Sequence, residues 1–359
     1  MFYNYVEKLN ILKVYVLSLC FSGFIPLFVS YLEGSLYRGT YPFLGKFIVW
    51  PIMLIAIFPV LNVIIVQFYQ KVKIAIVSLK DNKIIQVDPL MHRKIKEKLN
   101  FIKSKKKFAA QILLLIVVFS FYATKLTTMT ATWAIGDYWG ISLLYITIFV
   151  IYFIEVLILL NFIVDIFIWQ KIEVYLIYEE KFKFTPKLFH SDNAAGLSSI
   201  GDVAFKIYQV AFLFLIAFIV QIIEKYIVHP SWEMIEIITE YKAIPFTFLI
   251  LLFILPFTFF APLFPFNKWL QKFKKNYKKK LSNLLSNELS KVETSFFEKI
   301  DNEVISRAQD DLLKLKKINE IYSKINNIPS WPYDKTTIQS VASSILLPIL
   351  LSFISYILF

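Results

Sequence analysis

The chain has 359 residues, of which 57% are hydrophobic and only 18% charged, and its formal net charge is +13 at pH 7. Soluble globular domains are about 45–50% apolar, so this composition excludes an ordinary soluble domain and indicates a protein whose solvent is the bilayer. The single cysteine, Cys20, excludes an intrachain disulfide and a zinc or redox site built from cysteines.

Seven apolar runs are long enough to cross a bilayer, which takes about 20 helical residues. In chain order they are Ile11 to Leu32, Phe47 to Tyr69, Ala109 to Thr124, Trp139 to Ile168, Ile207 to Ile223, Ala243 to Leu263 and Ile338 to Phe359. The first run exceeds the apolar core of a signal peptide and no A-x-A-like site follows it, so we expect it to stay as a membrane helix. The fold class that follows is an all-α polytopic membrane protein with about seven transmembrane helices.

Basic residues are distributed unequally among the loops between these runs. If the helices alternate in direction, one set of loops holds 34 Lys and Arg residues and the other set holds five. Because Lys and Arg near membrane ends favour the cytoplasmic side, we expect a multi-pass protein of the cell membrane with its N-terminus in the cytoplasm and its C-terminus outside.

The runs and loops divide the chain into seven parts. These are transmembrane helices 1 and 2 (1–69), a basic cytoplasmic segment (70–108), helices 3 and 4 (109–168), a cytoplasmic loop (169–203), helices 5 and 6 (204–265), a long cytoplasmic helical region (266–328), and a linker with helix 7 (329–359). Both short cytoplasmic parts begin with β-branched runs before a charged turn, VKIAIVSL and KIEVYLIY, which is typical of small β-hairpins. In the first, Asp88 and Pro89 then predict the start of a basic helix that continues into helix 3.

Helix 2 contains prolines that predict a kink. Pro51 and Pro59 lack a backbone N–H, so carbonyls one turn earlier need donors from a neighbouring helix or a cavity. The same helix carries Asn62, whose amide also needs a partner in hydrocarbon.

The region from Phe266 to Ile328 contains neither glycine nor proline. Apolar residues recur in it about every 3.67 residues between Leu281 and Ile325, which is close to the period of a straight helix. We expect long cytoplasmic helices, about 90 Å if continuous, whose apolar stripe packs on a partner helix. A second protomer is the natural partner, so we expect a homo-oligomer.

Two basic clusters flank the predicted membrane ends, where an anionic leaflet attracts each Lys or Arg by about 1 kcal/mol. Their members are Lys103, Lys105, Lys106, Lys107, Lys274, Lys275, Lys278, Lys279 and Lys280. We expect both clusters to contact the lipid bilayer through anionic lipids. Nucleic acid is not the expected partner, because no RRM, KH or zinc-knuckle pattern accompanies the charge.

Glu155 lies about fifteen residues into helix 4 and therefore deep in hydrocarbon. A carboxylate there costs about 2.5–3.5 kcal/mol unless it is neutral, paired or in contact with water, so Glu155 should face the bundle interior. Asn62 lies at a similar depth and is its expected partner. Two interpretations stay open: a proton or cation site, and a neutral glutamic acid that joins two helices by a hydrogen bond.

Asn161 and Asp165 are four residues apart and share a face of the same helix. Both lie close to the predicted inner interface, just before Trp169. We expect them to be solvated at the wet end of the helix; the alternative is a vestibule of carboxylates that attracts cations. We rank Asn161 and Asp165 after Glu155 and Asn62 as candidates for an ion or proton site.

The loop FHSDNAAGLSSIGD contains His190, Asp192 and Asp202, side chains that suit zinc or manganese. Aspartates of this kind also have ordinary uses in turns and caps, and we expect Asp202 to cap helix 5. No H-E-x-x-H pattern, Ser-His-Asp order, phosphate-binding glycine loop or dinucleotide fingerprint occurs in the sequence. We therefore expect neither an enzyme nor a cofactor.

Two short motifs resemble those of a class of prokaryotic polytopic membrane proteins of uncharacterised activity. FHSDNAAGL is similar to their H-P-D-x-x-G-G-L loop before a membrane helix, with Ser191 in place of the proline and Ala195 in place of the first glycine. SWPYDKTT is similar to their W-P-F-D-[TK]-x-T before the last helix. The resemblance implies a multi-pass membrane protein and no particular reaction.

These patterns together favour an oligomeric protein of channel or transport type, with the cytoplasmic helices in assembly or gating. One alternative is a non-conducting scaffold or sensor that binds a cytosolic protein partner. Others are a membrane-perturbing effector of host defence and an intramembrane enzyme that uses His190 and Asp192.

Overall fold

The computed structural model describes residues 10–32, 51–82, 84, 109, 112–113, 116, 143–178, 196–228, 243–297, 302–327, 339, 341 and 343. Within these ranges the regular structure is entirely helical. Four helical segments there are long and apolar enough to cross a membrane: Ile11–Leu32, Ile52–Asp81, Ile146–Gln170 and Ser198–Ala217. The chain thus has the helices of a multi-pass membrane protein; the predicted spans at 109–124 and 338–359 lie almost wholly outside the described residues.

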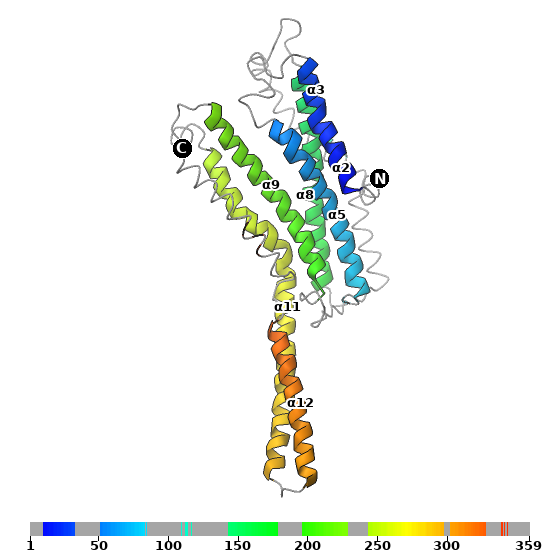
Figure 1. Ribbon diagram of the computed structural model, residues 1–359, viewed down its shortest axis with the longest axis vertical. Coiled ribbons are helices and arrows are strands. Elements are labelled where there is room, and N and C mark those ends of the chain that lie inside the picture. Colours follow the sequence, from blue (N-terminus) through cyan, green and yellow to red (C-terminus); the bar gives the residue numbers. More distant parts are fainter. Residues whose placement is uncertain are drawn as a thin grey trace.

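The helices form a bundle and a long stalk that projects from one end of it (Figure 1). The bundle contains α2 (Ile11–Ser18), η1 (Leu19–Phe24) and α3 (Ile25–Leu32) as one continuous helix, then η2 (Ile52–Ile57) with α5 (Phe58–Asp81), α8 (Leu143–Tyr178), α9 (Ser198–Val228) and the first part of α11 (Ala243–Phe297). The rest of α11 and α12 (Asn302–Asn327) make the stalk. α5 packs against both α2 and α9, and α9 also packs against α11, so α5 and α9 are the central elements.

Two of the helices are longer than the sequence predicts. α5 runs to Asp81 and α8 to Tyr178, so the β-hairpins predicted from VKIAIVSL and KIEVYLIY are wrong for these residues. In α5 the reason lies in Val72, Ala75 and Leu79, which follow a helical spacing and are all buried. Burial of this face outweighs the strand preference of the β-branched residues around it.

Two π-helical turns interrupt the first two membrane helices, and each ends two residues before a proline. η1 precedes Pro26 and η2 precedes Pro59. A π-turn bonds each carbonyl to the N–H five residues later rather than four, which widens the helix. At the two ends these longer bonds run from Ile25 N–H to Cys20 O and from Phe58 N–H to Met53 O.

The second π-turn leaves one buried carbonyl without a donor from its own helix. Phe58 N–H is committed to Met53 O, and Pro59 has no N–H to give to Leu54 O. Ser22 of η1 lies 2.6 Å from Leu54 O and donates to it. The prediction that a neighbouring helix must serve the prolines of helix 2 is confirmed for this carbonyl.

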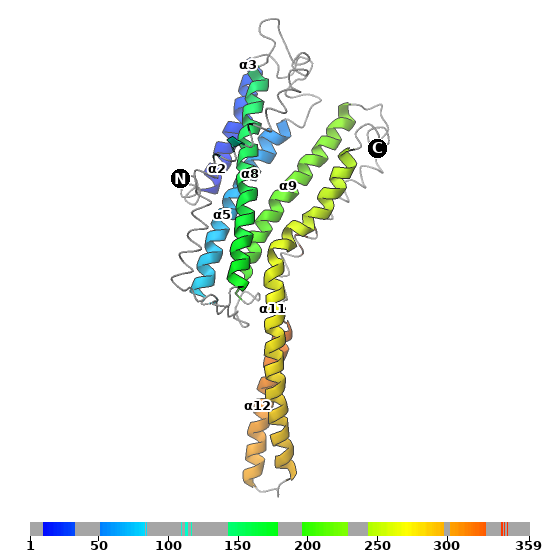
Figure 2. The same ribbon diagram turned by 180° about the vertical axis from the view of Figure 1, so that it is seen from behind.

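The stalk is a hairpin of two antiparallel helices and not one continuous helix (Figure 1, and from behind in Figure 2). α11 carries Pro256, Pro262 and Pro265 in the part that belongs to the bundle, bends there, continues to Phe297, and is followed by α12 from Asn302. Long helices were expected here, with a length of about 90 Å if they were continuous; the structure has two long helices, so the continuous case does not apply.

The apolar stripe of the stalk finds its partner within the same chain. Leu281 of α11 and Ile325 of α12 are buried in one cluster. Partly buried side chains pack around them: Phe273, Ile318, Ile321 and Tyr322. The stripe therefore does not need a second protomer to be covered along this stretch.

Aromatic side chains meet between helices at two places in the bundle. Phe68 of α5 meets Phe162 of α8 edge to face, with ring centroids 5.0 Å apart. Tyr208 of α9 meets Phe259 of α11 in the same way at 6.0 Å. The Tyr208 hydroxyl also donates to Val341 O at 3.2 Å, which places this part of the chain after the stalk against α9.

Candidate functional site

A polar site built from three helices lies inside the bundle, where α2, α5 and α8 meet. Glu155 is the tenth residue of the 25-residue candidate membrane span Ile146–Gln170, close to the middle of that span, and it is only 3% exposed. Asn62 of α5 donates through Nδ2 to Glu155 Oε1 at 2.9 Å and to Ser18 Oγ of α2 at 3.2 Å. The contact expected between Asn62 and Glu155 is thus present.

One oxygen of the Glu155 carboxyl group has no partner among the described residues. Oε2 is buried and receives no hydrogen bond from any of them. A buried polar atom left unsatisfied in hydrocarbon costs more than one in contact with water. A carboxyl group with one satisfied and one open oxygen can hold a proton on the open side, and that is the chemistry this arrangement allows.

The two π-turns lie directly beside this site. Ser18 is the last residue of α2 before η1, and Asn62 comes one helical turn after η2. The turns pack on each other closely, because a Cβ added at Gly23 of η1 would lie 3.4 Å from Ile55 Cγ1 and 3.6 Å from Ile55 Cα of η2. π-Turns are found frequently at functional sites, and here they fix the positions of two of the three polar residues.

A second carboxyl group of α8 is also buried, which corrects the expectation of a wet helix end. Asp165 is 4% exposed, and Tyr69 of α5 donates its hydroxyl to Asp165 Oδ2 at 2.6 Å. The solvation expected for Asp165 is wrong, because the helix continues to Tyr178 and the bundle covers this level. Asn161 is half-buried and donates through Nδ2 to Leu157 O of its own helix at 2.9 Å.

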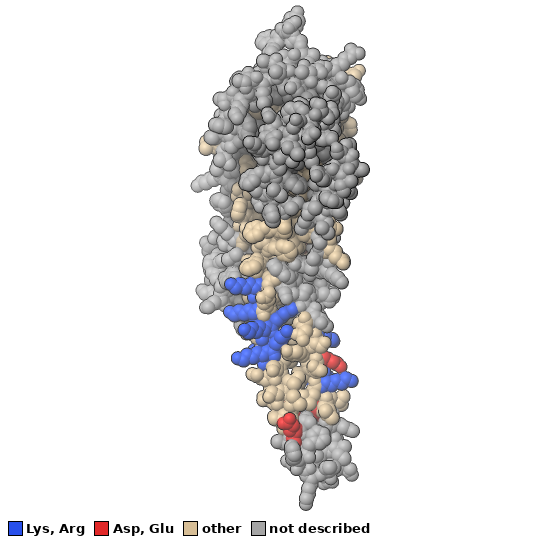
Figure 3. Space-filling model, turned by 90° about the vertical axis from the view of Figure 1, so that its left-hand side faces the viewer, with Lys and Arg blue, Asp and Glu red and all other residues tan. Residues whose placement is uncertain are grey.

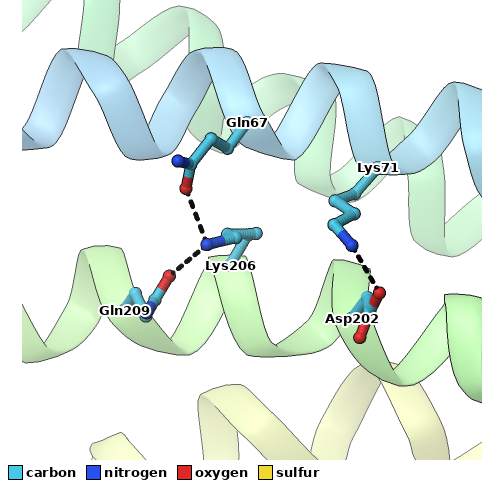
Figure 4. Close-up of polar contacts among 5 residues, drawn as sticks. All are labelled: Gln67, Lys71, Asp202, Lys206 and Gln209. Atoms are coloured by element: carbon cyan, nitrogen blue, oxygen red, sulfur yellow. Dashed lines mark hydrogen bonds and ion pairs between the residues drawn. The ribbon is translucent and has the colours of Figure 1, made fainter. Parts of the chain in front are cut away.

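Charged side chains meet between α5 and α9 (Figure 4), toward the end of the bundle from which the stalk projects (Figure 1). Lys71 of α5 forms an ion pair with Asp202 of α9 at 2.7 Å. One turn along, the Lys206 ammonium group donates to Gln67 Oε1 at 2.7 Å and to Gln209 Oε1 at 2.8 Å. We call these five residues the α5–α9 basic cluster.

The predicted metal site is only partly within the described residues. His190 and Asp192 lie outside them, and Asp202 is paired with Lys71. Among the residues that the structure describes, no group of three metal-binding side chains comes together. Asp202 does not cap its helix as expected, because α9 begins at Ser198 and places it within the first turns.

Gly196 is the one residue of the loop motif whose backbone is informative. Its φ is 84°, in the left-handed region that favours glycine, and it lies two residues before α9 begins. The second glycine of the H-P-D-x-x-G-G-L pattern corresponds to this position, so the turn gives a physical reason for a glycine there.

The stalk lysines gather next to the bundle, on the side seen in Figure 3. Lys275, Lys279 and Lys280 are exposed, and the Lys278 ammonium lies 5.9 Å from the centre of the Tyr322 ring. Lys274 is buried, which corrects its expected place at the headgroups; burial and then the nearby Lys278 charge lower the pKa of Lys274. The other basic cluster, 103–107, lies outside the described residues.

No family model, curated protein or solved structure matches this chain. The likeness of its two short motifs to a class of prokaryotic membrane proteins therefore stays a prediction. Function has to be argued from the polar sites just described.

Several of these polar residues were not singled out from the sequence. Tyr69, Gln67 and Lys206 each bond across a helix contact, yet only Asn62 was named on α5. A signal was present: Asn62 and Tyr69 are seven residues apart and therefore share a face of the helix. Gln67 and Lys71, four apart, share another face, and that face meets α9.

Proposed function

We propose that this protein is a membrane channel or transporter in which Glu155 is a proton-binding site. The observation that carries the proposal is a carboxyl group near mid-membrane that is 3% exposed, bonded by Asn62 on one oxygen and open on the other. Ionisable groups inside membrane spans mark ion and proton pathways by default, because burying them is costly. Basic residues are in excess on the stalk side, so we place that side in the cytoplasm.

The chemistry around Glu155 favours a proton over a metal ion. Hard metal ions take about six or more oxygen ligands. Here Asn62 turns its NH₂ group toward the carboxyl, and the neighbouring Ser18 hydroxyl is already bonded to that same amide. A proton needs only one free oxygen, and Oε2 of Glu155 is free of described partners.

The test is proton flux through the purified full-length protein in liposomes that enclose a pH-sensitive dye. A potassium gradient with valinomycin sets the driving voltage. Glu155→Gln should lower the flux at least about tenfold, because Glu155 is the titratable group among the described residues of the site and the change removes it. The fold should survive, since the glutamine Oε1 can still accept from Asn62.

Glu320→Gln is the matched control, because it makes the same chemical change on an exposed position of the stalk. It should leave the flux unchanged. Equal flux in wild type and Glu155→Gln would overturn the proposal, and so would a wild-type protein that passes no protons at either polarity. In that case Glu155 only joins two helices through its hydrogen bond with Asn62 and takes no part in proton transport.

A second candidate, a scaffold that binds a cytosolic protein, is favoured by the stalk surface. Four leucines of the hairpin are more than two-fifths exposed: Leu284, Leu289, Leu312 and Leu313. These apolar side chains on a projecting hairpin are available to contact a partner protein. This surface is also where a second copy of the chain would attach if the protein is a homo-oligomer.

Shortening the stalk separates these functions. Leu281 and Ile325 belong to the same buried cluster, so a short glycine-serine linker can replace residues 282–324 without stretching the chain. A scaffold should then lose its complex while membrane insertion and proton flux stay intact. If the particle size and bound proteins are the same after the replacement, the scaffold candidate fails.

A further inference from the structure

The α5–α9 basic cluster is the strongest polar feature that proton binding at Glu155 does not use. It contains two lysines and one carboxylate, so it carries one more positive than negative charge. The Asp202 carboxylate is bonded to Lys71. Among the described residues, the hydrogen-bond partners of Lys206 are neutral: the amide oxygens of Gln67 and Gln209.

The cluster also has more hydrogen-bond donors than acceptors. An ammonium group has three N–H donors. Lys206 uses two of them and Lys71 uses one, so three of the six remain without a described acceptor. Both glutamines turn their oxygens to Lys206 and keep their NH₂ groups for another acceptor (Figure 4). An excess of charge and donors of this kind fits an anion with several oxygens.

The position of the cluster points to a lipid rather than to a soluble anion. Lys71 and Asp202 are 37% and 48% exposed, so a ligand can reach them from the side of the bundle. From Ile207 to Ile223 α9 carries no charged residue, and Phe214 in this stretch is exposed, so acyl chains can contact an apolar side of the helix that carries Lys206. The cluster lies toward the stalk end, the same end at which the exposed stalk lysines gather.

We propose that the α5–α9 basic cluster binds the phosphate of an anionic lipid headgroup in the leaflet on the stalk side. Lys206 makes the central contact with the phosphate, and a free N–H of Lys71 donates to it as well. The NH₂ groups of Gln67 and Gln209 donate to the phosphate oxygens. Asp202 limits the affinity, because it repels the phosphate while it holds Lys71. The cluster therefore prefers a lipid with net negative charge over a zwitterionic one.

Native mass spectrometry of the full-length protein in mild detergent measures this directly. The protein is incubated with phosphatidylglycerol, and retained lipid is counted against phosphatidylcholine. Lys206→Gln should lower phosphatidylglycerol retention about fivefold, since one basic residue near an anionic lipid gives about that factor. Lys317→Gln removes the same charge from the exposed stalk, away from the bundle, and should have no effect.

Asp202→Asn supplies a test that misfolding cannot imitate, because it should raise retention rather than lower it. Lys206→Arg should keep it near the wild-type level. The proposal is overturned if Lys206→Gln retains as much lipid as wild type, if Lys317→Gln loses as much, or if Asp202→Asn fails to increase retention. Displacement of the lipid by millimolar inorganic phosphate would also overturn it, since the cluster would then bind a free anion. These outcomes do not depend on proton flux through Glu155.

Discussion

Replacing Ser22 by alanine tests how the two π-turns are held together. Ser22 Oγ lies 2.6 Å from Leu54 O and 2.8 Å from Ser18 O, and a hydroxyl group has one proton to give. We assign that proton to the shorter contact. Leu54 is fully buried, and neither Phe58 N–H nor Pro59 can serve its carbonyl. Ser22→Ala therefore leaves a buried acceptor without a donor.

The size of the effect follows from two measured ranges. A buried acceptor without a partner costs about 1–3 kcal/mol. Hydrogen bonds between membrane helices average about 0.6 kcal/mol and reach about 1.7 kcal/mol. Because Leu54 O has no second donor within its own helix, we expect the upper part of the membrane range, about 1–1.7 kcal/mol of unfolding free energy.

Pro59→Ala provides the decisive comparison, because alanine, unlike proline, has a backbone N–H that can reach the carbonyls of the π-turn. In that background Ser22→Ala should cost less than about 0.5 kcal/mol, a coupling that a double-mutant cycle measures. The assay is reversible unfolding of the full-length protein in mixed micelles, followed by tryptophan fluorescence. Equal costs of Ser22→Ala with proline and with alanine at position 59 would refute the reasoning.

Three further predictions concern packing and buried polar pairs. Gly23→Leu should destabilise the bundle by about 1–3 kcal/mol, because the Cβ alone would already lie 3.2 Å from Leu19 Cδ1 and 3.4 Å from Ile55 Cγ1. Unfolding in mixed micelles measures this free energy, and an unchanged value would contradict the close packing of η1 on η2. Tyr69→Phe should cost about 0.5–1.7 kcal/mol by removing the bond to Asp165, and a cost that persists in an Asp165→Leu background would show that the bond is not its cause. Ile325→Ala should loosen the stalk by about 2–4 kcal/mol and speed its proteolysis, while Leu312→Ala, at an exposed site, should stay within about 0.5 kcal/mol.

Depth in the membrane is what made the Glu155 site predictable. A carboxyl group halfway along an apolar span must face the bundle interior, and Asn62 was the polar residue at the matching level of helix 2. The hydrogen bond between them agrees with that reasoning. The need for a donor to the carbonyl that Pro59 leaves free was predictable from the same principle. That Ser22 is this donor was not predictable, because it depends on how the two helices are aligned, which the sequence does not show.

Errors arose where local signals conflicted with packing. β-Branched residues after Tyr69 favoured a strand, but the buried face through Val72, Ala75 and Leu79 keeps the chain helical. No glycine or proline lies between the end of α11 at Phe297 and the start of α12 at Asn302, so nothing in the sequence indicated that one helix ends and another begins, and the regular apolar period was read as continuing. Asp165 was misplaced because the predicted span ended ten residues before α8 does.

Because α11 bends within the bundle, a small rotation of the stalk about this bend moves its far end over a larger distance. From Phe266 to Phe297 the helix has no described break, a stretch of 32 residues and about 48 Å. A change of about 5° in the tilt of this arm at its membrane end would carry the tip through about 4 Å, as simple geometry over that length requires. α12 runs back along α11, and Val341, which follows it in the chain, contacts Tyr208 of α9. A small change in the angle between α9 and α11 would therefore appear as a larger displacement at the tip of the stalk.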